Sequence, residues 1–200
     1  MPFEKLKEKL EKNGFQVSVF ATGEDAAAYL NREIDHTTVG MGGSMTLAEL
    51  GLKESLSSHN VLFCHGFTPG DPAQVQQLAA GADVYLLSAN GVAEDTGELI
   101  NIDGNGNRVA SSLYGHKKVY FVIGKNKIAP DFHGALHRAR NIAAPKNAQR
   151  LGKKTPCAVK GDRCYDCDSP DRICRGLVVH YKKMNRMDME VVLIDQELGY

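Results

Sequence analysis

The sequence predicts an α/β fold: a mostly parallel sheet with helices on both faces, a hairpin inserted near residue 100 and a C-terminal cysteine-rich loop. Apolar residues at helical spacing alternate along the chain with short apolar runs that are typical of buried strands. This alternation is the pattern of parallel α/β sheets. The run Gly104-Asn-Gly-Asn107 is a strong hairpin signal. After Lys153 the apolar periodicity ends, and four of the five cysteines follow.

The composition is that of an ordinary globular protein. Of 200 residues, 42% are hydrophobic, and 24 basic residues balance 24 acidic ones. A neutral chain lacks the broad basic surface that coats nucleic acid, so we expect no nucleic-acid partner. No apolar run approaches the ~20 residues of a membrane span, and the N-terminal stretch lacks the apolar core of a secretory signal. We therefore expect a cytoplasmic protein whose cysteines serve metal or redox chemistry rather than disulfides.

The first half of the chain alternates helix and strand. Phe3, Leu6 and Leu10 share one helical face, and Thr22 is a typical N-cap for the next helix. Asp71 before Pro72 opens a later helix, because proline suits the first helical position. In chain order we expect a helix at 2–13, a strand at 15–20, a helix at 22–30, a strand at 36–40, a helix at 46–56, a strand at 61–64 and a helix at 71–81.

The second half begins with an apolar strand and the hairpin, and it ends in two more strands. A helix follows Pro130, and Pro145 restarts a second helical piece. The cysteine-rich stretch that follows has little apolar periodicity, so something other than a core has to order it. In chain order we expect strands at 83–87, 98–103, 108–111 and 118–123, helices at 130–139 and 145–151, a loop at 153–175, and strands at 177–181 and 189–194.

A glycine-rich turn joins the strand at 36–40 to the following helix. Glycines allow close approach to a ligand, while hydroxyls and the free amides of a helix N-terminus bind anions. Met45 stands where a dinucleotide-binding motif has its last glycine, and no Walker lysine follows. The alternative is a capping box of Thr46 with Glu49 after a tight turn. The residues that we expect to bind an anionic ligand are Gly40, Gly42, Gly43, Ser44 and Thr46.

A second polar stretch follows the strand at 83–87. Ligands of open α/β sheets bind beyond the carboxyl ends of the strands, so both polar stretches are expected to face one crevice. We expect Asn90 and Asn101 to bind the ligand, and Glu94, Asp95 and Asp103 are candidate catalytic acids or bases. The alternative is that these residues only shape the connection into the hairpin.

Several motifs together resemble the LUD (lactate-utilisation) domain family, and the resemblance covers nearly the whole chain. The motifs are Gly40-Met-Gly-Gly-Ser-Met-Thr46, Asp95-Thr-Gly-Glu-Leu99, Asn101-Ile-Asp-Gly-Asn-Gly-Asn-Arg-Val-Ala110, Ala144-Pro-Lys-Asn-Ala148 and Thr155-Pro-Cys157. The resemblance implies a Rossmann-like domain, similar in fold to sugar-phosphate isomerases and CoA transferases, whose glycine turn holds a phosphate or similar anion. Residues 1–152 would then form a LUD-type ligand-binding domain, and residues 153–200 a cysteine-rich metal-binding segment with the closing strands of that domain. Relatives belong to an iron-sulfur system that oxidises lactate to pyruvate.

Four cysteines near the end of the chain are expected to bind a metal. Four thiolates suit either a tetrahedral zinc ion or a four-iron cluster, although this spacing matches neither standard zinc modules nor common ferredoxins. The redox system implied by the resemblance favours a 4Fe-4S cluster over zinc. The alternatives are a redox-active dithiol pair and four free thiols. The expected ligands are Cys157, Cys164, Cys167 and Cys174, while Cys64 is expected to be a small buried residue.

The sequence therefore predicts a protein linked to lactate utilisation or related redox metabolism that binds a small anionic metabolite and an iron-sulfur cluster or metal. The competing hypothesis is a non-catalytic metabolite-sensing or assembly subunit with a structural zinc site. Other redox subunits and a second copy of the chain are the candidate protein partners.

Overall fold

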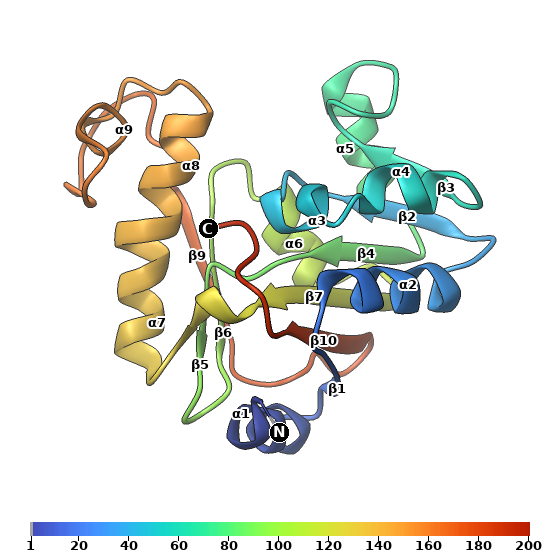
Figure 1. Cartoon of the computed structure of the whole chain (residues 1–200). Coiled ribbons are helices and arrows are strands. Elements are labelled where there is room, and N and C mark those ends of the chain that lie inside the picture. The colour runs from blue at the N-terminus through green and yellow to red at the C-terminus, as the bar shows by residue number, and fades with distance from the viewer. Residues whose placement is uncertain (1) are drawn as a thin grey trace.

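Six parallel strands form the main sheet of the protein, and the computed structural model describes residues 2–200 (Figure 1). Every neighbouring pair in this sheet is parallel. In spatial order the strands are β1 (Gln16–Phe20), β10 (Asp188–Ile194), β7 (Lys118–Gly124), β4 (Val84–Leu87), β2 (Thr38–Met41) and β3 (Val61–Cys64). This sheet confirms the predicted α/β, Rossmann-like class.

A smaller sheet of four strands packs beside the main one. Its strands, in spatial order, are β8 (Ile128–Ala129), β5 (Gly91–Ala93), β6 (Leu99–Asp103) and β9 (Gly176–His180). The hairpin expected near residue 100 is present, but it is formed by β5 and β6. The predicted second strand at 108–111 is wrong, because these residues lie in a helix that begins after Gly106, whose φ is 83°. A Gly-Asn-Gly turn serves a helix start as well as a hairpin, and only packing decides between them.

Helices cover both faces of the main sheet (Figure 1). One face packs against α1 (Glu4–Lys12), α5 (Pro72–Ala80) and the smaller sheet; the other packs against α2 (Gly23–Glu33), α3 (Met45–Glu49) and α4 (Leu52–Ser57). The remaining helical segments are α6 (Asn107–Leu113), η1 (Lys125–Lys127), α7 (Phe132–Arg138), η2 (Ala139–Ala143), α8 (Ala144–Arg150) and α9 (Pro156–Lys160).

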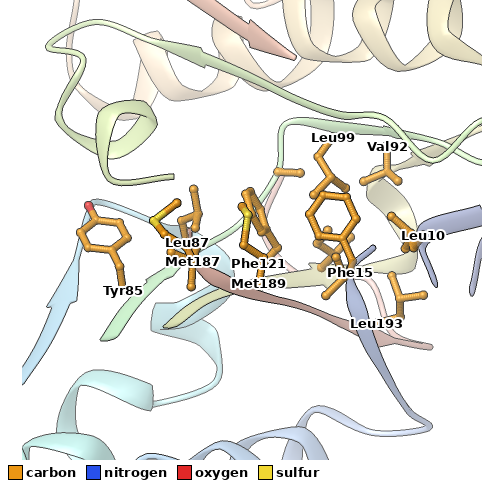
Figure 2. Close-up of a cluster of buried hydrophobic side chains, with 14 of the residues drawn as sticks. Leu10, Phe15, Tyr85, Leu87, Val92, Leu99, Phe121, Met187, Met189 and Leu193 are labelled. Atoms are coloured by element: carbon orange, nitrogen blue, oxygen red, sulfur yellow. The ribbon is translucent and has the colours of Figure 1, made fainter. Parts of the chain in front are cut away.

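The core follows the alternation of side chains along each strand. Phe121 and Ile123 of β7 point into the cluster beneath α1, whereas Tyr120 and Val122 point into the cluster beneath α2. Figure 2 shows the first cluster, in which Phe15, Leu99 and Phe121 join the main sheet to the hairpin. This packing fixes the position of the smaller sheet on the main one.

Two predicted helices differ from the observed ones. The single helix expected at 46–56 is broken into α3 and α4 at Gly51, which has a left-handed φ of 62°. Pro145 does not restart a separate helix, because α7 continues through the π-turn η2 into α8. The wider π-turn accommodates a proline, which lacks the amide hydrogen that a regular helix would use.

The two closing strands separate in space. β10 lies between β1 and β7 in the main sheet, whereas β9 forms an edge of the smaller sheet. Among the helices of residues 2–200, none combines the length and the apolar character needed to cross a bilayer.

Candidate functional site

A polar cavity of about 510 Å³ lies at the carboxyl ends of the central strands. The chain places β3 on one side of β2 and β4 on the other, which makes this end of β2 a topological switch point. The cavity reaches from the glycine turn and the loop after β6 across to α8 and the cysteine-rich segment. It is the crevice in which the two predicted polar stretches were expected to meet.

Three of the predicted ligand or catalytic residues line this cavity together. They are Gly43 after β2, Asn90 after β4 and Asp103 at the end of β6. Asn101 lies directly behind the cavity wall, fully buried, and it contacts the cavity through Arg108. The expected meeting of the glycine turn with the stretch at 90–103 is therefore present in the structure.

The structure does not bring Glu94 and Asp95 to the cavity. Both lie at the tip of the hairpin, where their backbone amides donate to the carbonyl oxygens of Ala129 and Pro130. The neighbouring Gly97 packs against Lys9 and Asn13, at the end of α1. Of the three candidate acids or bases, only Asp103 faces the cavity.

The hydroxyl groups of the glycine turn are already hydrogen-bonded to other groups of the protein. Ser44 is the N-cap of α3 and accepts from the Leu47 amide at 3.4 Å. Thr46 is fully buried, and its hydroxyl donates to the Leu198 carbonyl oxygen at 3.2 Å. Glu49 accepts from the Gly199 amide at 2.7 Å rather than from the turn. The alternative of a Thr46–Glu49 capping box is therefore wrong.

The glycines of the turn have different roles. A Cβ on Gly40 would overlap the Ala79 carbonyl oxygen and lie 2.7 Å from Tyr85 Cδ2, so Gly40 is needed for the packing of α5 on β2. A Cβ on Gly42 would lie 3.1 Å from the Tyr85 hydroxyl. A Cβ on Gly43 would meet nothing closer than His65 Nε2 at 3.9 Å, so this glycine opens directly onto the cavity.

Arg108 of α6 lines the cavity. The sequence predicted a strand at this position and did not identify Arg108 as a site residue. Its guanidinium donates to Asn101 Oδ1 at 2.6 Å, to the Ile102 carbonyl oxygen at 2.7 Å and to the Ser88 carbonyl oxygen at 3.2 Å. Burial lowers the pKa of Arg108, and the nearby carboxylate of Asp103 opposes that shift. A largely buried cation with fixed donors is a permanent source of positive potential at the site.

Asp103 combines one bonded and one free carboxylate oxygen. Its Oδ1 accepts from the amides of Asn105 and Gly106, both at 3.1 Å, which shapes the loop between β6 and α6. Its Oδ2 lies 3.6 Å from Arg108 Nε and has no hydrogen-bond partner within residues 2–200. His65, which also lines the cavity, has a buried Nδ1 without a partner in that part of the chain. These two unpaired atoms belong to side chains that line the cavity.

Cationic side chains dominate the rest of the wall. Besides Arg108, the cavity is lined by Arg150, Lys153, Arg172 and Arg175, against the two carboxylates of Asp103 and Asp171. Arg150 is held by Asn147 Oδ1 at 2.8 Å and by the Tyr200 hydroxyl at 2.7 Å. An excess of positive charge in a concave, polar site favours an anionic ligand.

The four predicted cysteine ligands line one small cavity of about 20 Å³. The Asp166 amide donates to Cys164 Sγ at 3.3 Å, and Thr155 Oγ1 lies 3.2 Å from Cys157 Sγ. Charge attraction to the Cys174 sulfur raises the pKa of Arg172. Cys64 is fully buried in the core beneath α2, as expected.

The donor set of this cavity suits a thiophilic metal, and its volume is that of about one water-sized sphere. A single ion matches this space better than a four-iron cluster does. Within residues 2–200, however, no three or more His, Cys, Asp or Glu side chains stand so that they could hold a metal ion. The sulfur atoms have to draw closer together before all four can bind one ion.

The fold and the motifs agree with the comparisons to known proteins. The sequence model of the LUD domain matches residues 3–194. The structure is similar to the crystal structure of a DUF162 family protein from Deinococcus radiodurans, with a TM-score of 0.52 and 10% identity. The similarity covers 95% of this chain and 94% of that one, and at this identity it shows the fold alone. No curated protein matches the sequence. The family match spans almost the whole chain, and the protein therefore belongs to the LUD domain family.

Proposed function

We propose that this LUD domain protein binds a small anionic metabolite in the cavity at the carboxyl ends of β2, β4 and β6, and a metal or iron-sulfur cluster at the four cysteines. Membership of the family relates the protein to lactate utilisation. The observation that carries the proposal is the basic cavity of about 510 Å³ at the switch point of the sheet.

The cavity wall supplies the donors for an anion. The side chains of Arg150, Lys153 and Arg175 reach the cavity from α8, from the residues after α8 and from the residue before β9. Guanidinium groups bind carboxylate or phosphate oxygens through paired hydrogen bonds, and a lysine ammonium adds a compact charge. Arg108 is committed to its protein acceptors, so it contributes potential rather than free donors.

Asp103 and His65 are the residues that would handle a proton of the bound metabolite. The side chains of Asp103 and His65 line the same cavity, and Asp103 Oδ2 and His65 Nδ1 are buried atoms without a partner in the described chain. A carboxylate oxygen can accept a hydrogen bond from a hydroxyl group of a hydroxy acid. This arrangement supports recognition of a hydroxy acid or keto acid, which is the chemistry of the lactate and pyruvate pair.

The cysteine cavity would hold the second component. Cys157, Cys164, Cys167 and Cys174 would be the ligands, with Arg172 next to them as a balancing charge. A cluster bound there would supply one-electron transfer, whereas zinc would supply only structural cross-linking. Cysteine thiolates can bind either an iron-sulfur cluster or a zinc ion.

A second candidate function is metabolite sensing or assembly with a structural zinc ion. The small volume of the cysteine cavity favours it. So does the segment 161–175, in which no residue is buried. Such a segment cannot be ordered by a hydrophobic core, and a metal cross-link would supply the missing free energy.

Anaerobic purification followed by metal analysis separates these possibilities. An iron-sulfur protein is expected to be brown, with absorbance at about 400 nm and both iron and sulfide present. A colourless protein with one zinc per chain supports the structural alternative, and a protein free of both metals contradicts the cysteine part of the proposal. Calorimetric titration with lactate, pyruvate and inorganic phosphate tests the cavity, and absence of binding by all three contradicts the anion part.

A further inference from the structure

Arg172 stands in the wall between the two cavities. It lines the large basic cavity and also the small cavity of the four cysteines. Its Nη1 donates to the Cys167 carbonyl oxygen at 2.8 Å, and its Nε donates to the Cys174 carbonyl oxygen at 3.0 Å. Its Nη2 donates to Asp166 Oδ1 at 2.9 Å. All these acceptors belong to the cysteine-rich loop, so the conformation of that loop determines where the guanidinium points.

Arg175 depends on the same loop. Its Nε donates to the Arg172 carbonyl oxygen at 3.0 Å, and its Nη2 donates to the Pro170 carbonyl oxygen at 3.1 Å. Its backbone amide donates to the Asp103 carbonyl oxygen at 2.9 Å, where β9 begins to pair with β6. Two of the five cations of the basic cavity are therefore carried by the stretch between Cys167 and the start of β9.

The loop has few other means of keeping its shape. No residue from 161 to 175 is buried, so no hydrophobic core orders it. Polar contacts tie it to the domain. They include hydrogen bonds from the Cys164 amide to Asn141 Oδ1 at 3.1 Å and from the Lys154 amide to Asp171 Oδ2 at 3.0 Å, and the ion pair of Arg140 with Asp166 at 3.4 Å. Asp166 has a left-handed φ of 45° between two of the cysteines, a conformation that Asp adopts more readily than most non-glycine residues.

We propose that the four thiols control the basic cavity through this loop: metal binding draws the cysteines together, fixes Arg172 and Arg175 in the cavity wall and thereby strengthens anion binding. This inference rests on the proposed anion site and on the proposed metal site at the four cysteines. The physical basis is conformational entropy. When the metal has already ordered the loop, anion binding no longer carries the free-energy cost of ordering it. The negative charge of a metal bound by four thiolates acts in the opposite direction, but solvent screens it at this exposed loop.

Calorimetric titration of inorganic phosphate into the full chain tests the coupling, with the reduced, metal-free protein compared with protein loaded with one Zn²⁺ per chain. We expect phosphate to bind about tenfold more tightly to the zinc form. By reciprocity, phosphate should strengthen Zn²⁺ binding by the same factor. Equal or weaker phosphate binding by the zinc form overturns the coupling and leaves the anion site intact. Absence of phosphate binding in both forms overturns the anion site, and the coupling with it.

Two arginine variants locate the coupling. Arg172→Lys keeps the charge but loses the fork that reaches Cys167 and Cys174, so it should bind Zn²⁺ yet show a smaller effect of zinc on phosphate affinity, the remainder passing through Arg175. Arg150→Lys alters a cation held by Asn147 and Tyr200, outside the loop, and should weaken phosphate binding equally in both forms. A zinc effect of wild-type size in Arg172→Lys means that Arg172 does not carry the coupling, and it contradicts the proposal.

Hydrogen exchange of the unmutated protein gives a second measurement that does not depend on the variants folding. Zn²⁺ loading should slow amide exchange across residues 161–175, and subsequent phosphate addition should slow it little further. Unchanged exchange of this segment on zinc loading contradicts the proposed ordering.

Discussion

Arg108 Nη1 lies 2.6 Å from Asn101 Oδ1, and this contact joins α6 to β6 beneath the basic cavity. Asn101 is fully buried, and its side-chain oxygen accepts a hydrogen bond from Arg108. The guanidinium also bonds two backbone carbonyl oxygens, of Ser88 and Ile102. One side chain therefore holds together three segments that surround the candidate site.

Replacing this arginine should destabilise the protein and the cavity together. Arg108→Met leaves the Asn101 and Ser88 acceptors unpaired in the interior, for which we expect a loss of about 3 kcal/mol. For a chain of this size the melting temperature should fall by about 6–12 °C. Differential scanning calorimetry measures this change. The exposed Arg150→Met variant is the control and should lose about 1 kcal/mol or less. Equal losses in the two variants would contradict the role of Arg108.

Replacing Asp103 should change phosphate affinity, whereas replacing Glu94 or Asp95 should not. Asp103→Asn keeps the Oδ1 acceptor of the loop amides and removes a negative charge from the cavity, so phosphate should bind about fivefold more tightly. Glu94→Gln and Asp95→Asn, at the hairpin tip, should leave phosphate affinity unchanged. Titration calorimetry at low salt compares the three variants. A larger effect from either hairpin variant than from Asp103→Asn would place the ligand elsewhere.

Stability should depend on pH through Lys127. This side chain is 3% exposed and donates to Ser88 Oγ at 3.1 Å. Burial, followed by repulsion from Arg138 and Arg108, lowers the pKa of Lys127 from 10.5 to about 7. Between these values the unfolded chain binds a proton that the folded chain does not, so the free energy of unfolding rises with pH. The slope contributed by this group is at most about 1.4 kcal/mol per pH unit.

Lys127→Met tests this assignment by urea denaturation between pH 7 and pH 10. The variant should lose the upward slope that the wild-type protein shows in this range. Lys125→Met is the control: Lys125 is exposed and pairs with Asp195, so this variant should keep the slope. A Lys127→Met protein with the wild-type pH dependence would refute the assignment.

The glycines of the turn should respond differently to a methyl group. Gly40→Ala overlaps the Ala79 carbonyl oxygen, a backbone atom that cannot move aside, so we expect a loss of about 3 kcal/mol. Gly43→Ala faces the open cavity and should change the free energy of unfolding by about 0.5 kcal/mol or less. Denaturation midpoints measure both variants. Similar losses would mean that Gly43 is also a packing glycine.

Replacing a proposed ligand cysteine and replacing the core cysteine should have different effects on Zn²⁺ affinity. Cys167→Ser should weaken Zn²⁺ binding at least about tenfold, because it removes one of four thiolates. Cys64→Ala lies in the core beneath α2 and should leave Zn²⁺ affinity unchanged while lowering stability. A competition assay with a chromophoric chelator measures both affinities. Wild-type zinc binding by Cys167→Ser would remove this residue from the proposed ligand set.

The meeting of Gly43 and Asn90 could be predicted from sequence, because each follows a strand of the main sheet and the carboxyl ends of parallel strands reach the same edge. Asp103, the last residue of β6, reaches the same cavity from the smaller sheet. The same rule misplaced Glu94 and Asp95. They follow β5, which belongs to the smaller sheet, and a short hairpin carries them to the side of α1. Sheet membership depends on pairing between distant segments, which local periodicity does not reveal.

Other members of the site had no distinctive local pattern. Arg108 was expected in a strand, and its place in α6 under the cavity came only from the structure. Nothing in the neighbouring residues indicates that Thr46 would be used by the Leu198 carbonyl oxygen, which is 152 positions away. Arginine side chains are long, so their partners are decided by packing over a wide radius.

Periodicity, glycine placement and cysteine clustering are local properties, and they were sufficient to specify the α/β class, the turn after β2 and the four grouped thiols. Tertiary structure decided which of those features share a surface. It set Arg172 between two cavities, took Thr46 and Ser44 out of the ligand site, and brought Asp103 to the cavity but not Glu94 or Asp95. The physical reason is that secondary structure follows from neighbouring residues, whereas a site is built from side chains that long-range packing brings together.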